Sequence, residues 1–341
     1  MKNLSKGKPI RVQQDILPLP HLSHTDVEDN PDEWKFAPII VSTNMERLNI
    51  ARLKARLWAE ENDTYVFKWR SKLIKHQNKP SSSAMDKITE DNAFFWQFWI
   101  AGAPANLSHN INGDLALVNG APITLHSLTW DDEKEFMRIQ ELTKEDSALP
   151  FGSEIEIAQP LAINIAVDKS LDGKPVSRRR QLQLNQLQQF SIVEDKIVLP
   201  ITTAIAPSSG NKNKKFTYKT GNLISPIATA EVSQPFPFDL AFAITVHKAQ
   251  GRTMDRVVVD LSSHPTYITQ MNFAAVFVAM SRVRNGNHLR LLPHPGNRNQ
   301  HNQHLPSLKI SQAVMAFYHG FSGHPSEGMH WSPALALQYE S

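Results

Sequence analysis

The sequence of 341 residues contains no cysteine. Disulfides and thiolate metal sites are therefore excluded, and the absence fits an intracellular protein, nuclear or cytoplasmic. No apolar run approaches the length of about 18 residues that spans a membrane, so no membrane partner is expected. The first residues, from Met1 to Pro9, hold no apolar core and do not form the pattern of a signal peptide.

A second absence concerns nucleotide chemistry. The phosphate-loop pattern Gly-x-x-x-x-Gly-Lys-[Ser/Thr], whose backbone cradles nucleotide phosphates, occurs nowhere in the sequence. Two Gly-Lys pairs exist, Gly7-Lys8 and Gly173-Lys174, but a proline follows each pair and the upstream glycine is missing. We therefore expect this chain to lack a complete site for magnesium and ATP.

Composition allows a folded, mildly basic protein of about two domains. Hydrophobic residues make up 41% of the sequence, which is enough for a substantial core. The formal net charge is +3, and the sequence holds 14 histidines. Such a balance permits a polyanionic partner without requiring one, since dedicated DNA binders are usually more basic.

The pattern of apolar residues predicts an α/β fold with a β-rich interruption. Strands are expected where short apolar runs end in turn residues, and helices where apolar residues recur every three or four positions. Residues 1–35 have neither pattern and are predicted to be an irregular leader. The expected elements are strands at 38–43, 64–69, 115–118, 123–128, 155–167, 190–201, 240–246, 257–261 and 289–292, and helices at 45–58, 86–95, 273–280 and 310–317.

Strand-helix units on both sides of a β-rich region suggest one parallel-sheet domain interrupted by a small barrel. We predict that residues 36–110 and 235–292 form the parallel-sheet domain and that residues 111–234 form the insertion. Within the insertion, Val193 to Lys196 is predicted to be a hairpin turn and Trp130 to Glu133 a solvated acidic turn. Residues 293–341 are predicted to be a C-terminal extension.

The most informative motif follows the strand at 240–246. The motif Thr245-x-His247-Lys248-x-Gln250-Gly251-x-Thr253 specifies a polar residue or glycine at six of its nine positions. Any one of these residues alone would more often belong to an ordinary polar loop. In open α/β sheets, however, ligands bind beyond the carboxyl ends of strands, where hydroxyl, imidazole and backbone N–H groups can hold phosphate oxygens.

A second motif ends the predicted helix at 273–280, where Val278-Ala-Met-Ser-Arg282 is followed by Arg284. A guanidinium suits contact with a phosphoryl group, because its planar fork neutralises charge spread over several oxygens. The alternative is structural: an arginine at a helix C-terminus interacts favourably with the helix dipole. For Arg284, a structural salt bridge is as good an interpretation as a functional one.

Together the two motifs resemble motifs V and VI of the superfamily 1 DNA helicases of the RecD/PIF type. The resemblance implies a RecA-like second motor domain, with single-stranded DNA as partner and with ATP and Mg²⁺ as cofactors. The residues that it assigns to the DNA backbone are Thr245, His247, Lys248 and Thr253. It assigns Gln250, Gly251, Arg282 and Arg284 to the nucleotide, with Arg282 against the γ-phosphate as the catalytic residue.

Two weaker matches lie earlier in the chain. Residues 38–47 resemble motif IV of the same helicases, which makes Asn44 and Arg47 neighbours of the nucleotide, although Asn44 is an equally good helix cap. Residues 104–112 and 117–120 resemble the segment that opens the inserted small barrel, which is similar to a Src-homology-3 fold. The resemblance covers roughly 36–125 and 235–292 and does not extend to 293–341.

The implied function is the C-terminal motor domain of a 5′-to-3′ DNA helicase. Because the phosphate loop and the magnesium-binding residues of the family are missing, we expect no ATP hydrolysis by this chain alone, and a separate N-terminal motor domain would have to supply them. The alternatives are a non-enzymatic single-stranded DNA-binding remnant and a split-helicase partner. A small-molecule α/β enzyme is disfavoured, because no convergent acid-base set is evident.

Two further features have ordinary explanations. The histidines of residues 293–341 lack the spacing of a zinc site on a recognisable helix, so no metal is predicted. The aromatic strings Phe94 to Trp99 and Phe67-x-Trp69 could stack nucleotide bases, but core packing is the more frequent role.

Overall fold

The computed structural model describes about two thirds of the chain, in two compact units. The units are Met1–Asn44 with Ile244–Ser341, and Met45–Ala243. The described residues are 19–71, 73–76, 95–113, 117–144, 147–168, 192–193, 196–203, 214–219, 227–232, 235–261, 271–292, 305–308, 321–322 and 330–337.

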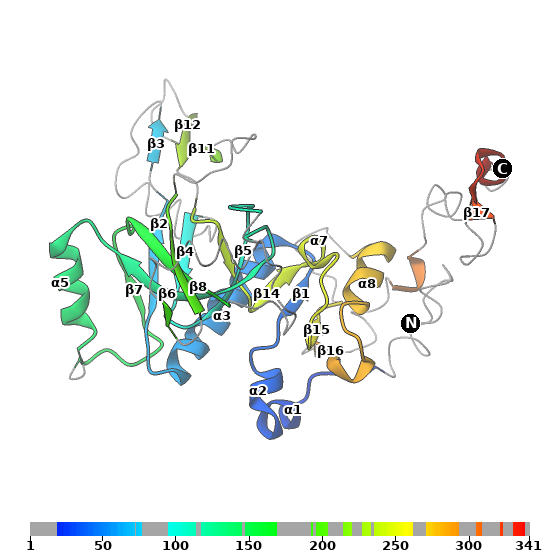
Figure 1. Ribbon diagram of the computed structural model, residues 1–341, viewed down its shortest axis with the longest axis horizontal. Coiled ribbons are helices and arrows are strands. Elements are labelled where there is room, and N and C mark those ends of the chain that lie inside the picture. Colours follow the sequence, from blue (N-terminus) through cyan, green and yellow to red (C-terminus); the bar gives the residue numbers. More distant parts are fainter. Residues whose placement is uncertain are drawn as a thin grey trace. The chain divides into compact units, whose positions relative to one another are not determined.

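The first unit is built on a four-stranded sheet with the order β14-β1-β15-β16 (Figure 1). β15 runs parallel to both β1 and β16. Every residue of β1, β14 and β15 is buried, as expected for parallel strands covered on both faces. The strands are β1 (Ile39–Val41), β14 (Ala243–Thr245), β15 (Val257–Val259) and β16 (Leu289–Leu291).

Helices and apolar side chains complete the core of this unit. The helix α8 contributes Val276, Ala279 and Met280, and Leu305 is fully buried in the same cluster. Asn272 begins α8, because its side-chain oxygen accepts a hydrogen bond from the N–H of Ala275. The other elements are α1 (His24–Asp29), α2 (Pro31–Trp34), α7 (Val246–Ala249), α8 (Phe273–Met280), α11 (Pro333–Leu337), the short helices η4 (Gly286–His288) and η5 (Leu305–Ser307), and the paired strands β17 (Phe321–Ser322) and β18 (His330–Trp331).

The predicted irregular leader contains two short helices, α1 and α2. Ser23 caps α1, because its hydroxyl accepts from the N–H of Asp26 while the Asp26 carboxylate accepts from the N–H of Ser23. The Arg290 guanidinium then donates to Asp26 at 2.8 Å and lies 4.2 Å from the centre of the Trp34 ring. The sequence analysis missed these two helices: the Ser23–Asp26 capping box is a local signal that it did not use, and the contact of Asp26 with Arg290 joins residues far apart in the sequence.

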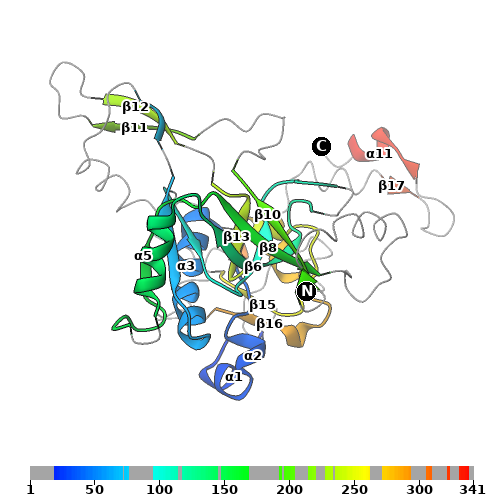
Figure 2. The ribbon, with the colours of Figure 1, turned by 60° about the vertical axis from the view of Figure 1, so that its left-hand side comes forward.

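The second unit consists of antiparallel and mixed sheets. Its largest sheet has the order β13-β5-β6-β8-β10-β9, and β6, β8 and β10 are drawn together in Figure 2. β9 and β10 pair antiparallel, with Lys196 opposite Val193, which confirms the predicted hairpin. The elements are α3 (Asn44–Glu61), α5 (Glu133–Leu142), β2 (Val66–Arg70), β3 (Leu73–His76), β4 (Trp96–Trp99), β5 (Pro104–Leu107), β6 (Pro122–Thr129), β7 (Glu154–Glu156), β8 (Ala162–Asp168), β9 (Ile192–Val193), β10 (Lys196–Ile201), β11 (Lys214–Lys219), β12 (Ile227–Val232) and β13 (Phe238–Leu240).

Glu154 joins three elements of the second unit. The Arg52 guanidinium of α3 donates two hydrogen bonds of 2.7 Å to its carboxylate, and the Lys68 ammonium of β2 donates one of 2.9 Å. Burial raises the pKa of Glu154, but the hydrogen bonds from Arg52 and Lys68 outweigh burial and lower the pKa to about 2. The carboxylate of β7 is therefore charged and paired with α3 and β2.

Several elements differ from those that the sequence predicted. The acidic segment at Trp130 to Glu133 leads into α5, where the Asp132 side chain accepts from the N–H of Lys134. The predicted strands at 155–167 and 240–246 are each two strands, and β13 and β14 belong to different sheets. The predicted helix at 310–317 and most of the one at 86–95 lie outside the described residues.

The fold is therefore mixed α/β, with a parallel sheet and separate antiparallel sheets, as the sequence pattern indicated. β1 and the end of the predicted strand at 240–246 are neighbours in one sheet. The two compact units divide the chain at Asn44 and Ala243, so residues 45–110 fall in the unit with 111–243. The predicted extent of the parallel-sheet domain, 36–110 and 235–292, stays a prediction.

Asp26 should stabilise the first unit in a pH-dependent way. The hydrogen bond from Arg290, and those from Ser23, outweigh partial burial and lower the pKa of Asp26 from 3.8 to about 2. A carboxylate whose pKa is lower in the folded state stabilises the fold above about pH 4, and this contribution disappears as the pH falls toward 2. Asp26→Asn should therefore lower the free energy of unfolding at pH 7 by about 2 kcal/mol.

Urea unfolding of the variant and the wild type at pH 7 and at about pH 2 measures this effect. The difference between the two proteins should shrink at the lower pH. Asp29→Asn, at an exposed position of the same helix, is the matched control. Equal loss of stability in the two variants at neutral pH would contradict the role given to the Asp26–Arg290 pair.

Candidate nucleic-acid and nucleotide site

The segment that carries the first motif begins at the end of β14. Thr245 is the last residue of β14 and stands at the N-cap of α7, although its side chain makes no capping hydrogen bond. Its side chain is buried, whereas His247 is exposed and Lys248 is half-buried on the following turn. The strand therefore presents polar side chains beyond its carboxyl end, but Thr245 itself faces the interior.

The residues after α7 form a tight turn. Gly251 adopts a φ of +78°, in the left-handed region where a side chain is strained. Gln250, Gly251 and Thr253 are exposed, so their polar groups are accessible to a ligand. The N–H of Arg252 donates to the carbonyl of Ala249 at 3.2 Å, which closes the turn. The positive φ therefore explains why a glycine occupies position 251 of the motif.

Arg282 connects this turn to the end of α8. Its Nε donates to the carbonyl of Val278 at 2.7 Å, and one terminal nitrogen donates to the carbonyls of Ala249 and Arg252 at 3.4 and 3.1 Å. The other terminal nitrogen donates to Ser281 Oγ at 2.7 Å. The structure therefore brings the two sequence motifs together and makes Arg282 their side-chain link.

A backbone hydrogen bond also joins the segment after the turn to the end of α8. The N–H of Met254 donates to the carbonyl of Arg282 at 2.8 Å, and Met254 forms a parallel bridge with Val283. The sequence also allowed a structural role for Arg282, a contact with the C-terminus of its helix. The hydrogen bond from Arg282 to the carbonyl of Val278 in α8 is such a contact. Arg284 is exposed, and no ion pair of Arg284 is found among the described residues.

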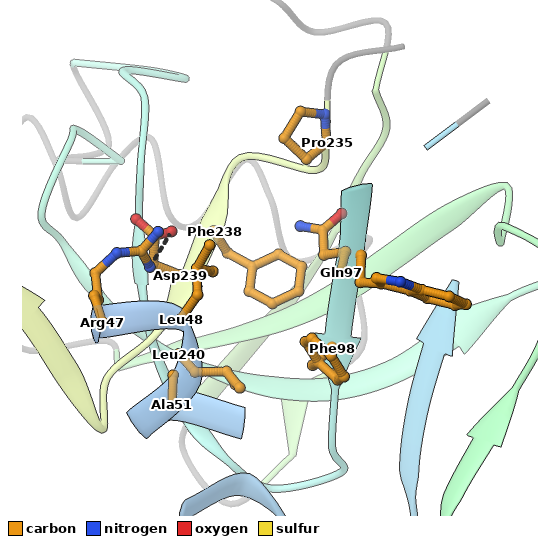
Figure 3. A pocket seen from close by; sticks show the side chains of 10 residues that line it. Arg47, Leu48, Ala51, Gln97, Phe98, Pro235, Phe238, Asp239 and Leu240 are labelled. Carbon is orange, nitrogen blue, oxygen red and sulfur yellow. Dashed lines mark hydrogen bonds and ion pairs between the residues drawn. The ribbon is translucent and has the colours of Figure 1, made fainter. Parts of the chain in front are cut away.

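The two residues of the predicted motif IV lie on α3. Asn44 is exposed at the start of the helix. Arg47 is buried, and its guanidinium donates to the Asp239 carboxylate at 2.8 Å (Figure 3). Sequence reasoning did not identify Asp239, because nothing in the run from Phe236 to Leu240 marks it as the partner of a residue so distant in the chain. The structure gives Arg47 a buried ion pair, and its contact with a nucleotide stays a prediction.

This ion pair borders a small hollow of about 100 Å³ in the second unit. Figure 3 shows Phe238 between the Arg47–Asp239 pair and Gln97. Gln97 is held in place by two hydrogen bonds with the backbone of Phe236, one donated and one accepted. The other lining residues are apolar: Leu48, Ala51, Trp96, Phe98, Pro235 and Leu240.

The aromatic strings pack mainly as core. Trp69, Phe98 and Trp99 are buried in the second unit, in agreement with the role favoured from the sequence. Phe67 and Trp96 are half-buried, and Lys68 and Arg70 lie 5.0 and 4.8 Å from the centre of the Trp96 ring. Phe94 lies outside the described residues.

Clusters of metal-ligating side chains and membrane-spanning helices are both absent from the described residues. No group of three or more histidine and acidic side chains converges there, and of the six histidines in the C-terminal extension only His330 is described. The helices of the described segments are too short or too polar to cross a membrane.

Comparison with known proteins gives matches among solved structures alone. No family model matches the chain, and no curated protein matches it. The chain is similar to the Pif1 helicase of Candida albicans, with 16% identity and a TM-score of 0.38 over 84% of this chain and 52% of that one. It is also similar to a Bacteroides Pif1 bound to single-stranded DNA, with 14% identity and a TM-score of 0.37 over 82% of this chain and 44% of that one.

A third similar structure is a Bacteroides Pif1 in complex with ADP-AlF3 and single-stranded DNA, with 13% identity and a TM-score of 0.39 over 82% of this chain and 44% of that one. The chain thus spans about half the length of the solved Pif1 helicases that it matches. Because the identities and TM-scores are low, any function of this chain has to follow from its own residues.

The Arg47–Asp239 pair should be structural. Asp239→Ala leaves a buried guanidinium without its carboxylate, and breaking such a pair costs about 3 kcal/mol or more in the free energy of unfolding. The double variant Arg47→Met/Asp239→Leu removes both charges and should recover most of this stability. Chemical denaturation of the three proteins measures the effect. A single variant as stable as the wild type would contradict a structural role.

Proposed function

We propose that this chain is the C-terminal motor domain of a Pif1-like ATP-dependent 5′-to-3′ DNA helicase. In this proposal the first compact unit holds a RecA-like sheet, and the second includes the small-barrel insertion. The observation that carries the proposal is the joining of the two sequence motifs. The turn at Ala249–Arg252 and the end of α8 meet through the guanidinium of Arg282.

Single-stranded DNA would contact the exposed side of the first motif. His247, Lys248 and Thr253 offer an imidazole, an ammonium and a hydroxyl beside the exposed backbone of Gly251. These groups suit phosphate oxygens, which are recognised without regard to base sequence. Thr245 also belongs to the proposed DNA site, but its buried side chain limits it to a backbone contact unless the turn opens.

The nucleotide would lie against Arg282, with Gln250, Gly251, Arg284 and Asn44 as its proposed neighbours. A guanidinium stabilises the charge that develops on a transferring phosphoryl group. The sequence holds no phosphate loop to position Mg²⁺ and ATP for this arginine. A second polypeptide segment carrying that loop would therefore have to supply the rest of the site.

A second candidate function is non-enzymatic binding of single-stranded DNA. It is favoured by the same missing phosphate loop and by the four hydrogen bonds that already engage the Arg282 guanidinium within the chain. The two candidates differ in one outcome. A phosphate-loop domain should stimulate ATP hydrolysis in the first case and have no effect in the second.

Binding to DNA tests what the two candidates share. The purified chain should bind single-stranded DNA weakly, with an affinity that falls as salt rises, because phosphate contacts release counterions. His247→Ala/Lys248→Ala should weaken binding to all sequences alike and reduce the salt slope by about 0.7 for each phosphate that the variant no longer neutralises. Fluorescence-anisotropy titration over a series of salt concentrations gives both quantities.

The control for this titration is Lys134→Ala, which removes a positive charge from an exposed position on α5. Its affinity and salt slope should match those of the wild type. Unchanged affinity in the His247/Lys248 variant would show that the first motif does not contact DNA.

ATP hydrolysis distinguishes the candidates. The chain alone should not hydrolyse ATP, whereas a mixture with a phosphate-loop domain encoded at the same locus should do so. Arg282→Ala should then reduce the rate by about 10³-fold, the scale of an arginine at a transferring phosphoryl group. Phosphate release under single-turnover conditions is the measurement. DNA-stimulated hydrolysis by the chain alone would refute the proposed division of the site.

A further inference from the structure

The guanidinium of Arg282 donates hydrogen bonds to two separate segments of the chain. Two of its four acceptors, the carbonyls of Ala249 and Arg252, are the ends of the turn that contains Gly251. The other two, Val278 and Ser281, lie at the end of α8. The guanidinium therefore bridges two segments that are far apart in the sequence.

The turn needs such support. Gly251 at a φ of +78° is a residue of high conformational freedom, and it stands between the exposed Gln250 and the half-buried Arg252. Carbonyls at both ends of the turn accept from the same nitrogen of Arg282, which fixes their separation. The carbonyl of Arg282 accepts from Met254, so the backbone just after the turn is held by the same residue.

Only a guanidinium can make this set of contacts. It has five N–H groups in a rigid planar fork, and four acceptors surround it here. A lysine ammonium carries the same charge but three donors on a flexible stem, so it cannot reach α8 and both ends of the turn in the same geometry. Replacing Arg282 by lysine therefore keeps the positive charge and removes the geometry of the contacts.

We propose that Arg282 is the positioning residue for the turn at Ala249–Arg252, and that it sets the geometry of the side chains on either side of it. His247 and Lys248 precede the turn, and Thr253 follows it. This inference rests on the proposed function for its consequence, since ordering the turn would order the proposed DNA contacts. Arg282 would then affect DNA binding without touching DNA.

Residue-resolved hydrogen exchange on the full chain tests the positioning role. In Arg282→Ala and Arg282→Lys, the amides of Arg252 and Met254 should exchange about tenfold faster or more, because the hydrogen bonds that hold the turn are absent. The amide of Val258, which donates to Pro38 at 3.0 Å, reports on the parallel sheet and should not change. Lys35→Ala, a charge removal elsewhere in the first unit, is the control.

Gly251→Ala perturbs the same turn from the other side. An alanine at this φ is strained, so the amides of Arg252 and Met254 should again exchange faster while Arg282 remains. This variant keeps the test valid if Arg282→Ala fails to fold. Unchanged exchange at Arg252 and Met254 in Arg282→Ala would overturn the proposal, and so would wild-type exchange at both amides in Arg282→Lys.

Titration with single-stranded oligonucleotide separates positioning from direct contact. A positioning residue predicts equal loss of affinity in Arg282→Ala and Arg282→Lys, with the salt slope of the wild type. Direct contact predicts a slope smaller by about 0.7 in the alanine variant and a preserved slope in the lysine variant, which would overturn the proposal. If the wild type binds no DNA, the proposed function fails, and hydrogen exchange still decides the role of Arg282.

Discussion

Parallel pairing of β1 with β15 is the contact on which the first unit depends. It places Ile39 beside Val258 and Ile40 beside Val259, so residues more than 200 positions apart in the sequence share one sheet. Fully buried valines and isoleucines make this pairing favourable despite the long separation. β14 and β16 take their places on either side, and with them come α7 and α8, which carry the two motifs. Without this pairing, no sheet would hold α7 and α8, and with them the turn and Arg282, next to each other.

The sequence predicted best those elements whose signals are local. The helix α8 was predicted with its observed bounds, because an unbroken apolar run between Asn272 and Ser281 has few other interpretations. Turn chemistry at Val193 to Lys196 was sufficient for the hairpin. The helix α5 was missed although Asp132 is a good cap, because the acidic segment before it was interpreted as solvated loop.

Contacts between distant residues could not be predicted. Neither the Arg47–Asp239 pair nor the Asp26–Arg290 pair has a signature in the sequence, since each joins segments that only the tertiary fold brings together. The same limit applies to the candidate site. The resemblance to motifs V and VI predicted Arg282 and the turn at Gln250–Gly251 as site residues, which stays a prediction, and it did not indicate that Arg282 contacts the ends of that turn. The burial of Thr245 could not be predicted from the sequence either, because threonine is compatible with both the interior and the surface of a protein.

The position of the second unit in the chain has a consequence for folding. Residues 45–243 leave the sheet after β1 and return at β14, and these two strands are neighbours. For the first unit, the whole second unit is therefore one long loop that must be closed before the sheet can form. An unfolded loop of that length opposes closure by an entropy that grows with the logarithm of its length. A second unit that folds first presents a far shorter effective loop, which favours an order of folding in which the inserted unit precedes the unit that surrounds it.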